Sequence, residues 1–141
     1  MRVWAIGVAI LGFLTGAVPA LGSSGADTFR LPSGNIYCAY EHYSFAPIDL
    51  RCEIRTGVRP LPPKPKWCDV DWGSGLEVGR RGTGHVVCAG DTVFGGKRVL
   101  GYRKSLRRGR FTCTTYRNGV RCVNSRTTHG FKLARRKATW F

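Results

Sequence analysis

The chain has 141 residues and carries 23 Lys and Arg against eight Asp and Glu, a formal net charge of +15. This length is enough for one modest hydrophobic core and excludes a second domain of ordinary size. No known catalytic, cofactor-binding or metal-binding motif occurs in it, so we expect no cofactor.

The N-terminus has the pattern of a secretory signal peptide. Arg2 precedes an uncharged apolar run from Val3 to Val18, followed by small residues that favour cleavage after Ala20 or Ala26. The run is shorter than the ~20 residues of a comfortable transmembrane helix, although an uncleaved anchor remains an alternative. No Cys lies near either cleavage point, which argues against a lipid anchor.

We therefore predict a signal peptide at residues 1–26 and one secreted domain at 27–141, located outside the cytoplasm or in the cell envelope. No stable transmembrane segment is expected after processing.

Short runs rich in Val, Ile, Tyr, Phe and Thr alternate with turn signals along the mature chain. No window shows a helical stripe, so the pattern predicts an all-β fold, a small antiparallel sandwich or barrel stapled by three disulfides. A proline-rich stretch, Arg59–Lys66, predicts an extended surface connector. The predicted strands are Asn35–Tyr40, Asp49–Arg55, Leu76–Val78, Gly84–Ala89, Lys97–Tyr102, Arg110–Thr115, Val120–Asn124 and Phe131–Leu133.

All six cysteines lie in the mature part, an even count that indicates three disulfides in an oxidising compartment. A metal site is the alternative, but no two of them form a C-x-x-C pair. Six cysteines allow 15 connectivities, and spacing alone does not choose among them. The cysteines are Cys38, Cys52, Cys68, Cys88, Cys113 and Cys122.

Local pattern suggests the pairing at one hairpin. Asn118-Gly119 between two β-prone runs is a strong hairpin signal, because a type I′ turn needs positive φ at both central residues. With that turn, Thr115 faces Cys122, and Cys113 is a diagonal neighbour of Cys122 on the same side of the sheet. We predict the bridge Cys113–Cys122.

A similar pair of apolar-x-Cys segments, Ile36–Cys38 and Leu50–Cys52, lies earlier in the chain. By analogy we pair Cys38 with Cys52, which leaves Cys68 with Cys88.

Five short motifs follow one another along the mature chain: PSGNIYC (32–38), CDVDWG (68–73), CAGDTV (88–93), GVRCVN (119–124) and HGF (129–131). In this order they resemble a family of small secreted actinobacterial domains of unknown function. The likeness spans about Phe29 to Phe141 and supports secretion and disulfides, but it implies no activity. The Arg-rich C-terminal part departs from that family's pattern, so a function based on charge applies to this member.

The excess of positive over negative charge is confined to the second half of the mature chain. Residues 27–91 hold eight basic and eight acidic residues, whereas residues 92–141 hold fourteen basic residues and no acid. Such crowding favours a polyanion on the surface, although an incidental basic surface is an equally simple reading. The anion-binding candidates are Arg103, Lys104, Arg107, Arg108, Arg110, Arg135, Arg136 and Lys137.

We expect these residues to contact an anionic envelope or extracellular polymer, or lipid head groups. Arg suits bidentate contacts to phosphate or carboxylate. We do not expect specific nucleic-acid recognition, because no known reader motif occurs. The sequence does not indicate an oligomeric state.

The alternative function is a secreted hydrolase of cell-wall polymers, which predicts a pocket containing His85 or His129. A triad of Ser74 or Ser105 with His85 and Asp91 lacks a nucleophile motif, so we assign no catalytic residue. Residues 69–80 depart from a calcium loop, and we expect Asp69 and Asp71 to cap a turn and pair with Arg. A protein-binding module is a third class, favoured by a large exposed apolar patch.

Overall fold

The computed structural model describes residues 27–41 and 49–141, and in them it contains ten strands and no helix. The predicted signal peptide and His42 lie outside the described residues. The strands are β1 (Asp27–Arg30), β2 (Ile36–Glu41), β3 (Asp49–Ile54), β4 (Trp72–Val78), β5 (His85–Cys88), β6 (Ser105–Arg108), β7 (Phe111–Tyr116), β8 (Gly119–Asn124), β9 (Gly130–Ala134) and β10 (Thr139–Trp140).

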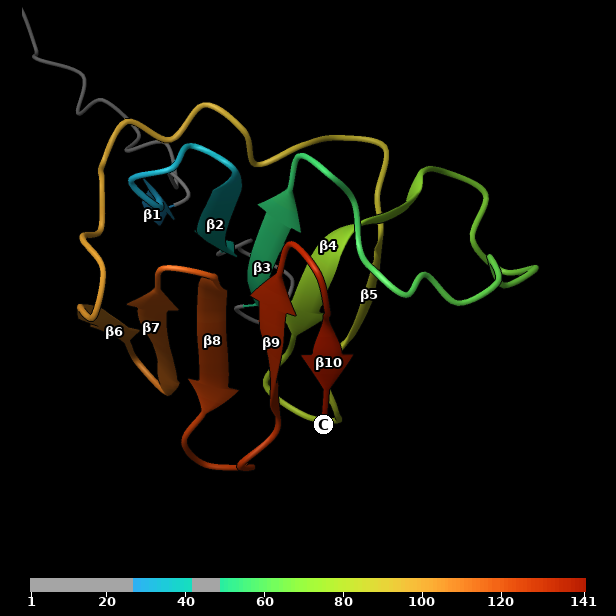
Figure 1. Cartoon of the computed structure of the whole chain (residues 1–141). Helices are drawn as coiled ribbons and strands as arrows, with labels where there is room; N and C mark the ends of the chain where they lie inside the picture. The colour runs from blue at the N-terminus through green and yellow to red at the C-terminus, as the bar shows by residue number, and fades with distance from the viewer. Residues whose placement is uncertain (1–26, 42–48) are drawn as a thin grey trace, which may run out of the picture.

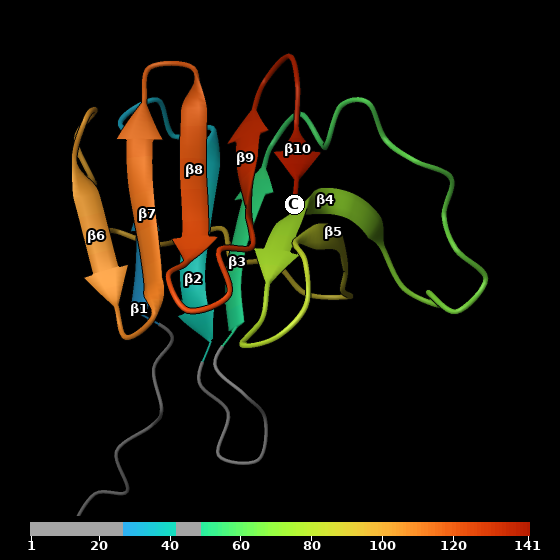
Figure 2. The same cartoon turned by 90° about the horizontal axis from the view of Figure 1, so that it is seen from below.

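The strands form two five-stranded antiparallel sheets that pack face to face (Figures 1 and 2). One sheet, sheet A, has the order β1-β2-β3-β4-β5, and the other, sheet B, has the order β10-β9-β8-β7-β6. Every pairing between neighbours in a sheet is antiparallel, so each sheet is a simple meander. The predicted all-β sandwich is confirmed.

The core lies between the sheets and follows from the alternation along each strand. In β7, Phe111, Cys113 and Thr115 are buried, while Thr112 and Thr114 lie on the outer face and are only partly covered. Phe29 from sheet A and Phe131 from sheet B are fully buried in the same cluster. Burying one face of each sheet is what makes the sandwich stable.

The three disulfides are the predicted ones, Cys38–Cys52, Cys68–Cys88 and Cys113–Cys122. Two of them join directly opposite residues of neighbouring strands, one in each sheet. They meet at the centre of the core, where the Sγ atoms of Cys52 and Cys122 are 3.7 Å apart. The third bridge ties the segment before β4 to the end of β5.

The register of the β7–β8 hairpin differs from the predicted one. Cys113 faces Cys122 directly, and the two turn residues are Arg117 and Asn118. Gly119 is instead the first residue of β8, where a Cβ atom would collide with the backbone oxygen of Leu133. Glycine is thus required for close approach of β9, not for a type I′ turn.

One predicted strand is wrong. Residues 97–102 belong to the long segment that crosses from sheet A to sheet B, and they form only an isolated bridge, Arg30 with Val99. The two hydrogen bonds of this bridge, Arg30 N to Arg98 O and Leu100 N to Arg30 O, hold the segment beside β1. The crossing segment has no other strand beside it with which to pair, so its alternating pattern does not lead to a β-strand.

A buried ion pair holds the crossing segment on the outer face of sheet A. Glu53 is fully buried, and its carboxylate accepts hydrogen bonds from the Arg51 guanidinium, Ser74 Oγ, Thr92 Oγ1 and Val93 N. Arg51 also donates to the Asp91 carboxylate and to its backbone oxygen, at 2.8 and 2.7 Å. These contacts satisfy polar groups that would otherwise destabilise the fold.

The stretch predicted as a connector, Arg59–Lys66, has no regular secondary structure and projects from one side of the sandwich (Figure 2). Trp72 Nε1 donates to Pro62 O at 3.0 Å, which ties this stretch to β4. Leu61 in this stretch, and Trp67 and Val70 just after it, are exposed large apolar residues. Among the residues that the structure describes, no helix is long and apolar enough to cross a membrane.

Candidate functional site: two basic surfaces

Most cations of this protein have no acidic partner. All eight acidic residues lie in the described part of the chain, and only three Lys or Arg side chains there form salt bridges: Arg51, Arg98 and Arg108. The remaining cations face solvent with uncompensated charge. Such a surface is stabilised by anions from outside the protein.

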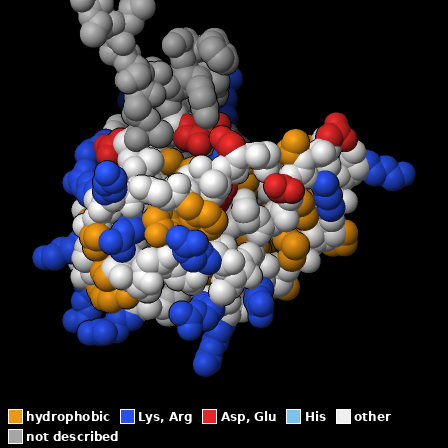
Figure 3. Space-filling model, turned by 90° about the horizontal axis from the view of Figure 1, so that it is seen from above, with side chains coloured by type: hydrophobic (Ala, Val, Ile, Leu, Met, Phe, Trp, Pro, Cys, Tyr) orange, Lys and Arg blue, Asp and Glu red, His pale blue; other side chains and the backbone are white. Residues whose placement is uncertain are grey.

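The acids are concentrated on sheet A, away from most of the positive charge. Figure 3 views the molecule from the side of sheet A and shows acidic side chains, mixed with Lys and Arg, towards one end of this face, whereas only Lys and Arg extend from the other end. Sheet B contains no acid, because all its strands come from residues 105–140. The two sheets therefore differ in charge: sheet A carries acids together with cations, and sheet B carries cations alone. Six of the eight acids lie on sheet A or on the segment held against it: Asp27, Glu41, Asp49, Glu53, Glu77 and Asp91.

One end of the sandwich has a groove of about 560 Å³, here called the basic groove. Its walls come from the β1–β2 turn, the β7–β8 turn, β9 and the β9–β10 turn. Five cations and no acid line it: Arg117, Lys132, Arg135, Arg136 and Lys137. The β7–β8 turn, strand β9 and the β9–β10 turn bring them together, although they are up to twenty positions apart in the sequence.

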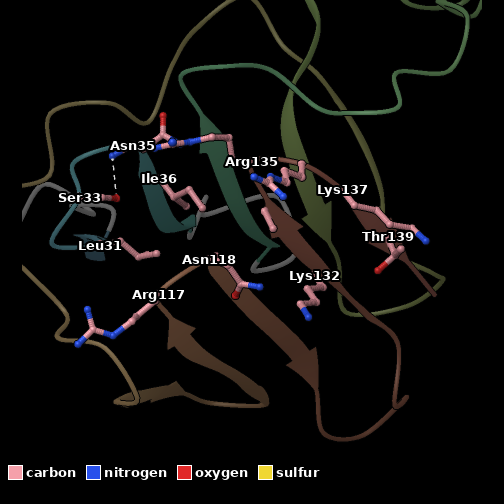
Figure 4. Close-up of a pocket in the computed structure, with 13 residues that line it drawn as sticks. Leu31, Ser33, Asn35, Ile36, Arg117, Asn118, Lys132, Arg135, Lys137 and Thr139 are labelled. Atoms are coloured by element: carbon pink, nitrogen blue, oxygen red, sulfur yellow. Dashed lines mark hydrogen bonds between the residues drawn. The ribbon is translucent and has the colours of Figure 1, made fainter.

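The groove is apolar at its base and polar around its rim (Figure 4). Leu31 and Ile36, both buried, contribute the apolar part. Ser33, Asn35, Asn118 and Thr139 add neutral groups that can hydrogen-bond an oxyanion. Such a site has the charge and donors to bind the phosphate or carboxylate groups of an extended polymer.

The opposite end of the sandwich has a smaller hollow of about 260 Å³, here called the arginine hollow. It also contains five cations and no acid: Arg80, Arg107, Arg108, Arg110 and Arg126. The pKa of Arg110 is lowered from its usual value by desolvation and by the positive charges of Arg80, Arg126 and Arg81. Like charges are therefore held close together here.

The structure divides the eight predicted anion-binding residues among three places. Arg135, Arg136 and Lys137 line the basic groove, and Arg107, Arg108 and Arg110 line the arginine hollow. Arg103 and Lys104 line neither; they are exposed in the turn before β6, where Arg103 N donates to Thr115 O.

Four lining cations were not among the predicted residues: Arg80, Arg117, Arg126 and Lys132. Arg80 lies in the half of the chain where acidic and basic residues are equal in number, and the other three lie outside the clusters of consecutive cations. A search for clusters of charge along the sequence therefore does not find these four residues. For Lys132 the sequence does contain a signal: it alternates with Phe131 and Leu133, which predicts that Lys132 lies on the outer face of a strand.

The polar residues considered for catalysis do not come together. Ser74 Oγ donates to Glu53, Ser105 Oγ contacts Thr114 Oγ1 and Asp91 pairs with Arg51, so no described bond joins them to His85. His85 Nε2 lies 2.8 Å from Glu77 Oε1, and its Nδ1 lies 3.3 Å from Thr83 O.

Both ring nitrogens of His85 thus face acceptors, which favours the imidazolium form, and the bond to Glu77 raises the pKa of His85. An imidazolium is a poor general base. His85 and Asp49 do line a hollow with Arg80, Arg81 and Arg110, but His129 does not.

The predicted Arg partners of Asp69 and Asp71 are absent from the described residues. Neither carboxylate forms a salt bridge, and both side chains are exposed. The prediction that they pair with Arg is wrong, because the nearby cations of the projecting stretch point into solvent, where charge pairing contributes little.

Comparison with known proteins places the chain in a family and adds no function. No curated protein and no solved structure matches it. A family model described as a family of unknown function, DUF6636, matches residues 9–141, in agreement with the resemblance to a domain of unknown function. The chain belongs to this family of unknown function, DUF6636.

Proposed function

We propose that this protein binds linear polyanions, polymers that carry repeated phosphate or carboxylate groups, and that the basic groove is its main binding site. The groove carries the proposal: five cations from the β7–β8 turn, strand β9 and the β9–β10 turn converge on one concave surface without an acid among them. A surface with incidental charge would be expected to scatter its cations over convex positions. The neutral hydrogen-bond donors and the apolar groups of the groove can contact the uncharged backbone of such a polymer, while the cations contact its charged groups.

The distribution of acids supports the same function. Sheet A presents most of the acids on one side of the molecule, and sheet B presents none. An approaching polyanion is therefore attracted more strongly to the second side than to the first. Charge arranged in this way directs encounter as well as strengthening binding.

The test removes three groove cations together, Arg135→Gln, Arg136→Gln and Lys137→Gln. The matched control removes three exposed cations of the projecting stretch, Arg59→Gln, Lys64→Gln and Lys66→Gln, with the same change in net charge. Binding to polyphosphate and to polyglutamate is measured by titration at several salt concentrations. The two polymers distinguish phosphate from carboxylate as the preferred group.

We expect the groove variant to bind about tenfold more weakly, which corresponds to ~1.4 kcal/mol, and the control to change little. Three lost contacts should reduce the slope of log affinity against log salt by about 2, since each contributes ~0.7 for a single strand. Equal losses in the two variants would show that net charge alone matters and would refute the groove as a site.

We also propose that the protein acts outside the cytoplasm. Three disulfides, two of them fully buried in the core, support an oxidising compartment. Mass spectrometry of the native protein should find a mature chain that begins at Leu21 or Asp27, with no free thiol. A full-length cytoplasmic product with six reduced cysteines would contradict this.

A further inference from the structure

The arginine hollow is a built feature and not an accident of flexible surface side chains. Its arginines come from the end of β6 and from three separate turns, β4–β5, β6–β7 and β8–β9. Asn124, fully buried, joins two of these turns: its Nδ2 donates to Gly79 O and Arg80 O, and its Oδ1 accepts from Arg126 N. Ser125 N donates to Arg110 O at 2.7 Å and so attaches the third turn.

These bonds hold positive charges together at a cost to the folded protein. Within the hollow only Arg108 forms a salt bridge, with Asp27. Asp49 lines a neighbouring hollow together with Arg80 and Arg110 and forms no salt bridge with them. His85 lies beside Asp49, paired with Glu77. The four other arginines of the hollow face one another without neutralisation, which an external anion would relieve.

The hollow lies at the end of the sandwich opposite the basic groove. The β7–β8 and β9–β10 turns are at one end of Figure 2, and the β6–β7, β8–β9 and β4–β5 turns are at the other. The six residues of β8 separate the ends by about 17 Å, at ~3.4 Å a residue. The two surfaces therefore face in opposite directions.

We propose that the arginine hollow is a second oxyanion site, so that one molecule joins two segments of polyanion, one at each end of the sandwich. The inference rests on the proposed function and extends it from binding to cross-linking. Arginine suits this site because its planar guanidinium donates paired hydrogen bonds to phosphate or carboxylate oxygens.

The test compares binding with cross-linking, using polyphosphate as the probe. The hollow variant carries Arg107→Gln, Arg110→Gln and Arg126→Gln; these changes leave the backbone bonds of Asn124 and Ser125 in place. The groove variant and the control variant are those described above. Affinity is measured at trace polymer concentration, and clustering by light scattering and sedimentation as protein and polymer approach equal amounts.

We expect the wild-type protein and the control to cluster polyphosphate. The hollow variant should keep its groove-mediated affinity within about threefold and lose clustering. The groove variant should also lose clustering, and its affinity should fall about tenfold. An unchanged urea midpoint verifies that each variant is folded.

Two results would overturn the inference and leave the proposed function intact. One is salt-sensitive binding by the wild-type protein in one-to-one complexes only, which would mean a single polymer spans both ends. The other is clustering by the hollow variant at the wild-type level. Failure of the wild-type protein to bind either polymer would instead refute the proposed function itself.

Discussion

Replacing Glu53 by Ala should destabilise this protein by about 3–5 kcal/mol, the typical cost of removing one partner of a buried ion pair. Glu53 is fully buried, and Arg51, its ion-pair partner, is 3 % exposed. The carboxylate accepts five hydrogen bonds from four residues, so its loss leaves the buried guanidinium with only Asp91 and the more distant Glu41 as counter-charges, and it leaves several donors without an acceptor. An unsatisfied buried donor alone costs ~1–3 kcal/mol.

The measurement is equilibrium urea unfolding with the disulfides intact, followed by tryptophan fluorescence. Asp69→Ala is the control, because Asp69 is exposed and forms no salt bridge; it should change the free energy of unfolding by less than about 0.5 kcal/mol. Because Glu53 binds Thr92 and Val93, the variant should also lose hydrogen-exchange protection in the crossing segment.

A double-mutant cycle separates the pair from its surroundings. Arg51→Met with Glu53→Leu should be less destabilising than the sum of the two single changes, since no charge is then left buried alone. A loss of less than about 1 kcal/mol in Glu53→Ala, or simple additivity in the cycle, would refute the view that this ion pair holds the crossing segment on sheet A.

Two further predictions concern stability and ionisation. Replacing Cys68 and Cys88 together by Ser should lower the free energy of unfolding by about 3 kcal/mol. The reason is that the bridge closes a loop with sequence separation 20 and so restricts the unfolded chain. An unchanged midpoint of urea unfolding would contradict this. His85 should titrate above its usual pKa in an NMR experiment and return towards it in Glu77→Gln, because the raised pKa comes mainly from the bond to Glu77. Because the pKa of His85 is raised in the folded state, its pair with Glu77 stabilises the fold fully below pH ~6.5, and this contribution is lost as the pH rises through the folded-state pKa. The free energies of unfolding of the wild-type protein and Glu77→Gln should therefore differ more at about pH 5.5 than at about pH 8. An equal difference at both pH values would argue against this reasoning.

Much of the architecture can be read from the residues alone. Period-two alternation, as in Phe111-Thr-Cys-Thr-Thr, predicts a strand with one buried face, because successive side chains point to opposite sides. The disulfide map also follows, since each of two cysteine pairs lies in a predicted hairpin and the third pair remains. The confinement of excess charge to residues 92–141 is a property of the sequence itself.

Pairing partners and register depend on tertiary contacts. The short strands β1, β6 and β10 have little pattern of their own and exist because a longer neighbour supplies hydrogen bonds. The β7–β8 register is set by Cys113 facing Cys122 and by the close approach of β9 at Gly119, and neither is visible in the Asn118-Gly119 signal.

The composition by itself determined a disulfide-bonded β-protein with an acid-free, cationic second half. Only the tertiary structure decided where those cations lie, because antiparallel meanders carry alternate turns to opposite ends of a sheet. Arg117 and Arg135 therefore meet in the basic groove, while Arg110 and Arg126 meet Arg80 in the arginine hollow. Runs of charge along a chain do not contain this information, since proximity in a sandwich is set by which turns share an end.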